Sequence, residues 1–173
     1  MDKKTIISLL IIIVGVASLV WWSKSVEKKE LNANELTKSH PARTGGALVA
    51  SQTFYDFGVI SMKNGNVSKM FKVSNSTDGD INLEKLSTSC MCTNAYLIQQ
   101  NGNKKGPFGM PGHGGAVSKV NELIKAGESR EIEVVYDPNA HGPAGVGMVD
   151  RLVFLEDASG NKLQFEIKAN VIP

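Results

Sequence analysis

The 173-residue chain has only two cysteines, Cys90 and Cys92, in the stretch Ser89-Cys90-Met91-Cys92-Thr93. Two residues separated by one position point to the same face of an extended strand, with Cα atoms roughly 6.6 Å apart. That separation is near the upper end of the ~4.4–6.8 Å that a disulfide spans, so a turn or bulge would favour a bridge. Two thiolates beside a thioether equally suit a soft metal ion such as Cu(I). The pair therefore indicates either a disulfide or a soft-metal site.

A glycine-rich segment follows the cysteines at residues 99–117 and holds six of the chain's 17 glycines. A loop of this length inside a compact domain is usually either functional or disordered. Near its tip, Met110 and His113 offer the thioether and imidazole that complement thiolates around a soft metal. Because the loop leaves the strand that follows Cys92, it can fold back over the cysteines. We therefore predict a Cu(I) site made by Cys90, Cys92, Met110 and His113, with Met91 as a spare ligand.

Simpler interpretations of these residues remain open. Met110 and His113 are then incidental members of a mobile loop, and the cysteines are either structurally inert or joined in a disulfide that stiffens a bend. Thiol exchange is a further alternative, but it needs a thiolate stabilised by neighbouring groups, and the local sequence shows none.

A second glycine-rich loop, at about residues 138–147, brings two more soft or borderline ligands, His141 and Met148. They approach the cysteines only if the two loops share one end of the domain. A plain solvent-exposed loop is the simpler interpretation.

The N-terminus predicts a membrane segment. Residues 5–22 contain no charge and end in Trp21 and Trp22, which suit the membrane–water interface. The apolar run continues beyond a conceivable cleavage point after Ala17, so an uncleaved signal anchor over residues 1–22 is favoured over a cleaved signal peptide. Lysines flank both ends of the span. We expect a cytoplasmic N-terminus and a single-pass membrane protein with an extracytoplasmic C-terminal domain, because a CxC pair suits an oxidising exterior.

A polar tether is predicted over residues 23–50. The first 50 residues hold seven Lys/Arg against four Asp/Glu, whereas residues 51–173 hold twelve against thirteen. The basic balance therefore belongs to the anchor and tether, and the C-terminal domain has no basic surface of the kind that nucleic acid requires.

From residue 51 onward, short alternating apolar runs are separated by Gly, Asn, Asp and Pro, which is typical of an all-β domain. The predicted strands are Gln52–Phe57, Val67–Ser74, Asp80–Leu86, Thr93–Ile98, Ser129–Tyr136, Val149–Leu155 and Lys162–Val171. The inward-facing core positions among them are predicted to include Phe71, Val73, Val134, Phe165 and Ile167. Seven strands in about 120 residues predict an immunoglobulin-like antiparallel β-sandwich at residues 51–173, preceded by the transmembrane helix.

Five segments in order carry a family resemblance. They are Asp56-Phe57-Gly58-Val59, Met70-Phe71-Lys72-Val73-Ser74-Asn75, Thr88-Ser89-Cys90-Met91-Cys92-Thr93, Ile124-Lys125-Ala126-Gly127-Glu128-Ser129 and Val134-Val135-Tyr136-Asp137-Pro138. Together they resemble a bacterial Ig-like domain family of unknown function that is similar to the hydin and abnormal-spindle modules. The resemblance covers residues 54–172 and implies a sandwich without implying a reaction. The sequence departs from the family pattern at Met91, where glycine is common, and in the glycine-rich insertion.

No Ser-His-Asp order, phosphate-binding glycine loop or paired catalytic carboxylates are present, so we do not expect an enzyme. The sequence favours a membrane-anchored module of the cell envelope that binds Cu(I). The competing hypothesis is a non-catalytic interaction or scaffolding module that contacts an envelope protein partner and carries a structural CxC disulfide.

Overall fold

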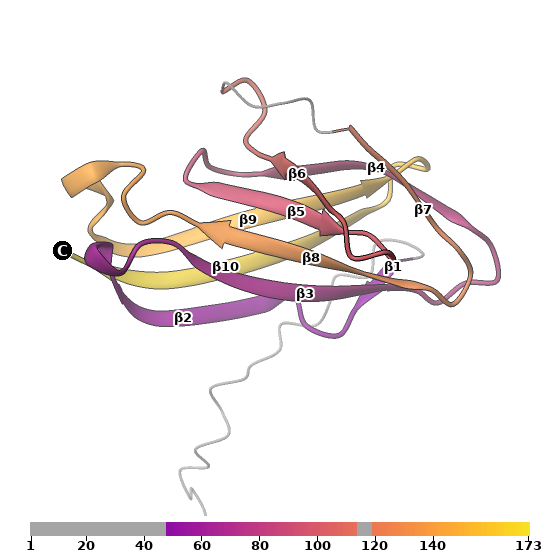
Figure 1. Ribbon diagram of the computed structural model, residues 1–173, viewed down its shortest axis with the longest axis horizontal. Helices are drawn as coiled ribbons and strands as arrows, with labels where there is room; N and C mark the ends of the chain where they lie inside the picture. Colours follow the sequence, from indigo (N-terminus) through magenta and orange to yellow (C-terminus); the bar gives the residue numbers. More distant parts are fainter. Residues whose placement is uncertain (1–47, 114–118) are drawn as a thin grey trace, which may run out of the picture. The chain divides into compact units, whose positions relative to one another are not determined.

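The computed structural model describes residues 48–113 and 119–173, which form two packed β-sheets (Figure 1). The strands are β1 (Leu48–Ala50), β2 (Phe54–Ser61), β3 (Val67–Asn75), β4 (Ile81–Thr88), β5 (Thr93–Ile98), β6 (Lys104–Phe108), β7 (Lys119–Ile124), β8 (Ser129–Tyr136), β9 (Gly147–Asp157) and β10 (Lys162–Ile172). Two short 3₁₀ helices, η1 (Met62–Asn64) and η2 (Gly142–Gly145), lie in the connections. The all-β prediction is confirmed.

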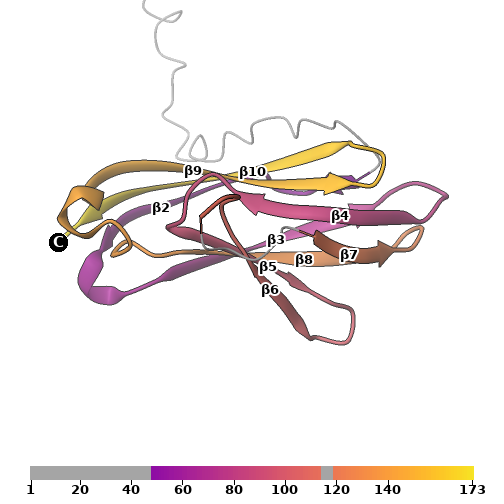
Figure 2. The same cartoon turned by 90° about the horizontal axis from the view of Figure 1, so that it is seen from above.

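One sheet has the order β2-β10-β9-β4-β7 and the other β1-β3-β8-β5-β6, and Figure 2 shows them stacked as two layers. The prediction of a wholly antiparallel sandwich is wrong for one pair, because β2 runs parallel to β10. A parallel pair needs a long crossover connection. The rest of the domain provides it, since β2 and β10 are the second and the last strands within the described residues.

All seven predicted strands are present, and Thr93–Ile98 and Ser129–Tyr136 match at both ends. Strand β10 alternates as predicted, with every second side chain buried. A polar-out, apolar-in alternation of this kind is what a sheet with one solvated face produces. The predicted inner face of β10 is therefore correct.

The core lies between the two sheets. All five predicted core positions are buried: Phe71, Val73, Val134, Phe165 and Ile167. The rings of Phe71 and Phe165, from opposite sheets, lie 4.7 Å apart between centroids. This contact ties the sheets together at the centre of the sandwich.

Three of the described strands, β1, β6 and β7, were not predicted from the sequence. Strand β1 falls in the last three residues of the predicted tether and pairs with β3. Strand β6 lies inside the glycine-rich segment 99–117 and pairs with β5, so this segment is not one continuous loop. Strand β7 carries Glu122 at a buried position, where it pairs with Arg130 at 3.0 Å. A buried carboxylate interrupts the apolar alternation that would otherwise mark a strand.

Within residues 48–113 and 119–173, no helix is long and apolar enough to cross a membrane. The predicted anchor at residues 1–22, and the tether up to residue 47, lie outside the described residues.

Candidate functional site

Cys90 and Cys92 lie in the turn that leads from β4 in one sheet to β5 in the other. The turn closes with a hydrogen bond from the Thr93 N–H to the Cys90 carbonyl at 3.1 Å. It brings the two cysteine Cα atoms to 5.3 Å, and a disulfide joins the sulfurs. The cysteines thus lie in a turn and not in a flat strand. A flat strand would hold their Cα atoms roughly 6.6 Å apart, which is near the upper limit for a disulfide.

The residues around the cysteines hold this turn against the sandwich. The Ser89 N–H donates to the Leu152 carbonyl at 2.9 Å, and the Ser89 hydroxyl accepts from the Leu152 N–H at 2.9 Å. The Thr88 hydroxyl is shared between the carbonyls of Cys90 and Thr93, at 3.0 and 2.9 Å. Ser89 and Thr88 therefore have a structural role, because their hydrogen bonds to backbone groups fix the turn.

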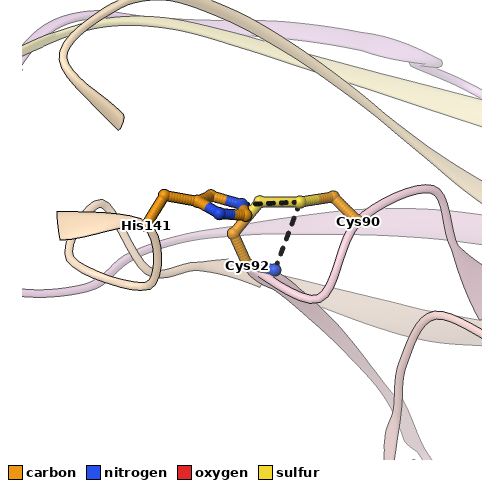
Figure 3. A group of neighbouring side chains, drawn as sticks. All are labelled: Cys90, Cys92 and His141. Carbon is orange, nitrogen blue, oxygen red and sulfur yellow. Dashed lines mark hydrogen bonds between the residues drawn. A yellow bond between two sulfur atoms is a disulfide. The ribbon is translucent and has the colours of Figure 1, made fainter. Parts of the chain in front are cut away.

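His141 approaches the disulfide from the loop between β8 and β9. Its Nε2 atom lies 3.2 Å from Cys90 Sγ, and Figure 3 shows the imidazole beside the bridge. The base of the loop is fixed, because the Asp137 N–H donates to the Cys92 carbonyl at 2.9 Å. The Asp137 carboxylate in turn accepts from the Asn139 N–H at 2.8 Å. The first bond ties the loop that carries His141 to the turn that carries the cysteines, and the second lies within the loop.

Arg151 reaches the second sulfur from β9. Its Nε lies 3.1 Å from Cys92 Sγ, while its Nη1 donates to the Asp150 carbonyl at 2.8 Å. Cys92 is fully buried and Arg151 is half-buried. A guanidinium stays charged under all ordinary conditions, so a permanent cation faces the buried sulfur.

Cys90, Cys92 and His141 present ligand atoms that all lie within 4.8 Å of one another. In the part of the chain that the structure describes, they make up the one group of three or more His, Cys, Asp or Glu side chains close enough to hold a metal ion. Two sulfur donors and one imidazole nitrogen form a soft to borderline ligand set.

The two cysteines of the predicted metal site are thus brought together, while His113 is not among the described side chains grouped with them. It is exposed in a turn after β6, with its N–H 3.4 Å from the Met110 carbonyl. Met110 follows Gly109, whose carbonyl accepts from the Thr88 N–H at 3.2 Å. The turn that holds Met110 and His113 therefore begins near the cysteine turn. A role for Met110 and His113 in metal binding stays a prediction. Residues 114–118 lie outside the described residues.

The sequence alone indicated His141 only as a conditional ligand and gave no prediction for Arg151. A signal for Arg151 exists in β9, where it occupies the same alternation phase as the buried residues Val153 and Leu155. An arginine on the inward phase of a strand implies a partner beneath it. For His141 the local sequence offers no comparable signal, since its place depends on two distant loops meeting at one end of the sandwich.

The chain matches no protein-family model and no curated protein. Among solved structures it is similar to a protein of unknown function from Porphyromonas gingivalis, with 16% identity, a TM-score of 0.52 and coverage of 76% of this chain and 50% of that one. The chain therefore spans half the length of that relative. Over the described residues, the fold is a β-sandwich of two five-stranded sheets.

Two further similarities to solved structures have TM-scores below 0.5. One is the PapD-like domain 7 of human CEP192, at 12% identity and a TM-score of 0.46 over 73% of this chain and 85% of that one. The other is the CupB2 chaperone of Pseudomonas aeruginosa, at 12% identity and 0.38 over 71% and 55%. At such identities a similarity concerns the fold alone, and function must be argued from the site.

Proposed function

We propose that the chain, once Cys90 and Cys92 are reduced, binds one Cu(I) ion through Cys90, Cys92 and His141. This proposal rests on one observation: the three ligand atoms all lie within 4.8 Å of one another at one end of the sandwich. They come from two separate connections, which hydrogen bonds hold together. Thiolate and imidazole are donors that Cu(I) accepts.

The charges around the site favour Cu(I) over a divalent ion. Two thiolates, a neutral imidazole and Cu(I) sum to one negative charge, and the Arg151 guanidinium lies 3.1 Å from one of the sulfurs to balance it. With Zn(II) the same ligands give a neutral complex, which the positive charge of Arg151 stabilises less. Structural zinc sites also take four protein ligands in tetrahedral geometry, whereas this group supplies three.

The proposed cellular setting is the extracytoplasmic face of a membrane, with residues 1–22 as a single-pass anchor. The apolar run at the N-terminus supports the anchor, and the Cys90–Cys92 disulfide supports an oxidising compartment. A protease added outside intact cells should then degrade the C-terminal domain. If degradation requires lysed cells, the domain faces the cytoplasm and this setting is wrong.

The proposed role of the Cu(I) site is metal handling or delivery. Titration of the reduced full-length chain with Cu(I), in detergent and under a reductant, tests it. One equivalent should bind to the parent, and none to the Cys90→Ser/Cys92→Ser double variant, because the thiolates are the principal donors. If the parent binds no Cu(I), the metal-binding proposal fails and the envelope interaction module takes its place.

A further inference from the structure

We propose that the Cys90–Cys92 pair is also a thiol–disulfide exchange site, with Cys90 as the sulfur that is attacked and Cys92 as the leaving sulfur. Exchange requires a disulfide that a thiolate can reach and a leaving sulfur whose developing charge is stabilised. The structure places groups that meet both needs around this pair, and neither need involves a bound metal.

Exposure distinguishes the two cysteine residues. Cys92 is fully buried beneath the turn, whereas Cys90 is half-buried and borders the exposed residues Met91 and His141. An incoming thiolate therefore meets Cys90 first. Attack must come along the S–S axis from the side of Cys90, and Cys92, on the core side of the turn, is then the sulfur that departs.

The charge that develops on Cys92 faces a fixed cation. The Nε–H of Arg151 points at Cys92 Sγ from 3.1 Å, and a second hydrogen bond, from its Nη1 to the Asp150 carbonyl, holds the guanidinium in place. A preorganised donor aimed at the atom that gains charge lowers the barrier, since it needs no reorganisation during the reaction. In this role Arg151 is a positioning and charge-stabilising residue for the leaving sulfur.

The complete exchange takes two substitutions. A partner thiolate forms a bond to Cys90 Sγ, the Cys90–Cys92 bond breaks, and its electron pair moves to Cys92 Sγ. The partner's second thiolate then attacks the partner sulfur of this mixed disulfide, so the partner's own disulfide forms and Cys90 leaves as a thiolate. The partner dithiol has lost two electrons to the cysteine pair, and its two thiol protons have passed to water.

The substrate class is therefore a thiol, and a dithiol for complete reduction of the Cys90–Cys92 pair. Low-molecular-weight thiols and protein cysteines share this chemistry. Reduced glutathione and a reduced dithiol peptide, compared at equal thiol concentration, show which source reacts faster.

The first test measures how fast each thiol reduces the oxidised full-length chain in detergent, with EDTA and a Cu(I) chelator present, by alkylation and mass spectrometry. Arg151→Gln should slow reduction at least tenfold, and Arg151→Lys should restore part of the rate because it keeps the charge. The matched control is Lys72→Gln, which removes an exposed cation from β3 and should react as the parent does. Equal rates for the parent and Arg151→Gln would overturn the proposal.

A second test asks which sulfur is attacked. Its result stays valid if the variants are slightly less stable than the parent. The reduced Cys92→Ser and Cys90→Ser variants are each treated with oxidised glutathione. Cys90 in the first should gain one glutathionyl group at least ten times faster than Cys92 in the second. The reverse order would overturn the assignment. Because all metal is chelated, failure of either test leaves the Cu(I) proposal standing, and failure of Cu(I) binding leaves this one standing.

Discussion

The Nε2 atom of His141 lies 3.2 Å from Cys90 Sγ although 51 positions separate the two residues in the chain. The contact exists because the β4–β5 turn and the β8–β9 loop meet at one end of the sandwich, where the Asp137 N–H bonds the Cys92 carbonyl. A pair of cysteines that would otherwise be only a local bridge thereby gains a nitrogen ligand.

Replacing His141 by Ala should weaken Cu(I) binding at least about tenfold, roughly 1.4 kcal/mol, because one of three donors is lost. Competition with a colorimetric Cu(I) chelator measures the affinity of the reduced chain. The matched control is His113→Ala, which removes an exposed imidazole outside the Cys90–Cys92–His141 group and should change affinity much less. If His113→Ala has the larger effect, the glycine-rich segment provides the nitrogen ligand and His141 does not.

The position of the His141 loop can be tested without touching a ligand. A Cβ at Gly145 would lie 3.3 Å from the Pro138 carbonyl oxygen and 3.4 Å from His141 Cβ, so Gly145→Ala should shift the loop that carries His141 slightly. We expect Cu(I) affinity to fall a few-fold while the fold persists. Gly79→Ala is the matched control, since a Cβ at Gly79 meets no atom within 4 Å. Equal affinities for these two variants would mean that the loop accommodates the methyl group without moving His141.

Much of the fold was predictable because its physical cause is local. Strand β10 alternates between buried and half-exposed side chains along almost its whole length, so its residues reveal both the strand and its inner face. Strand β6 was not predictable in this way. It contains Gly106 and Pro107, which usually mark turns, and it exists because β5 offers it a pairing edge.

The site was only half predictable for a similar reason. Two cysteines one residue apart are neighbours in any fold, so their chemistry could be inferred from spacing. The partners His141 and Arg151 come from elements whose contact with the cysteines is decided by sheet order, with β4 beside β9 and β5 beside β8. No local pattern encodes that order.

The N-terminal limit of the folded domain gives another prediction. Leu48 is buried and β1 pairs with β3. A chain starting at residue 48 should fold, whereas one starting at residue 51 should lose about 1.5–3 kcal/mol of unfolding free energy, the value of burying one leucine side chain. Urea denaturation of the two chains measures the difference. Indistinguishable midpoints would show that β1 adds nothing to stability.

A pH dependence follows from Tyr136. Burial raises the pKa of its phenol above the usual 10.0, with Arg151 opposing the shift and Asp137 adding to it. The unfolded phenol therefore ionises first as the pH rises. The stability linked to Tyr136 is complete below about pH 10 and is lost as the pH rises through the folded-state pKa.

Tyr136→Phe should consequently lose less unfolding free energy than the parent between about pH 9 and pH 11. Urea midpoints for both proteins across this interval provide the measurement, and comparing the two cancels the titration of lysines common to both. Parallel declines would indicate that the phenol is not protected from ionisation in the folded state.

In the proposed site, Cu(I) is bound by two cysteine sulfurs and one histidine nitrogen of this chain. X-ray absorption at the copper edge, recorded on the reduced full-length chain loaded with one equivalent of Cu(I), counts these donors directly. We expect two sulfur neighbours and one nitrogen neighbour, with the nitrogen lost in His141→Ala. A parent spectrum that shows sulfur neighbours alone, or one that His141→Ala leaves unchanged, would contradict it.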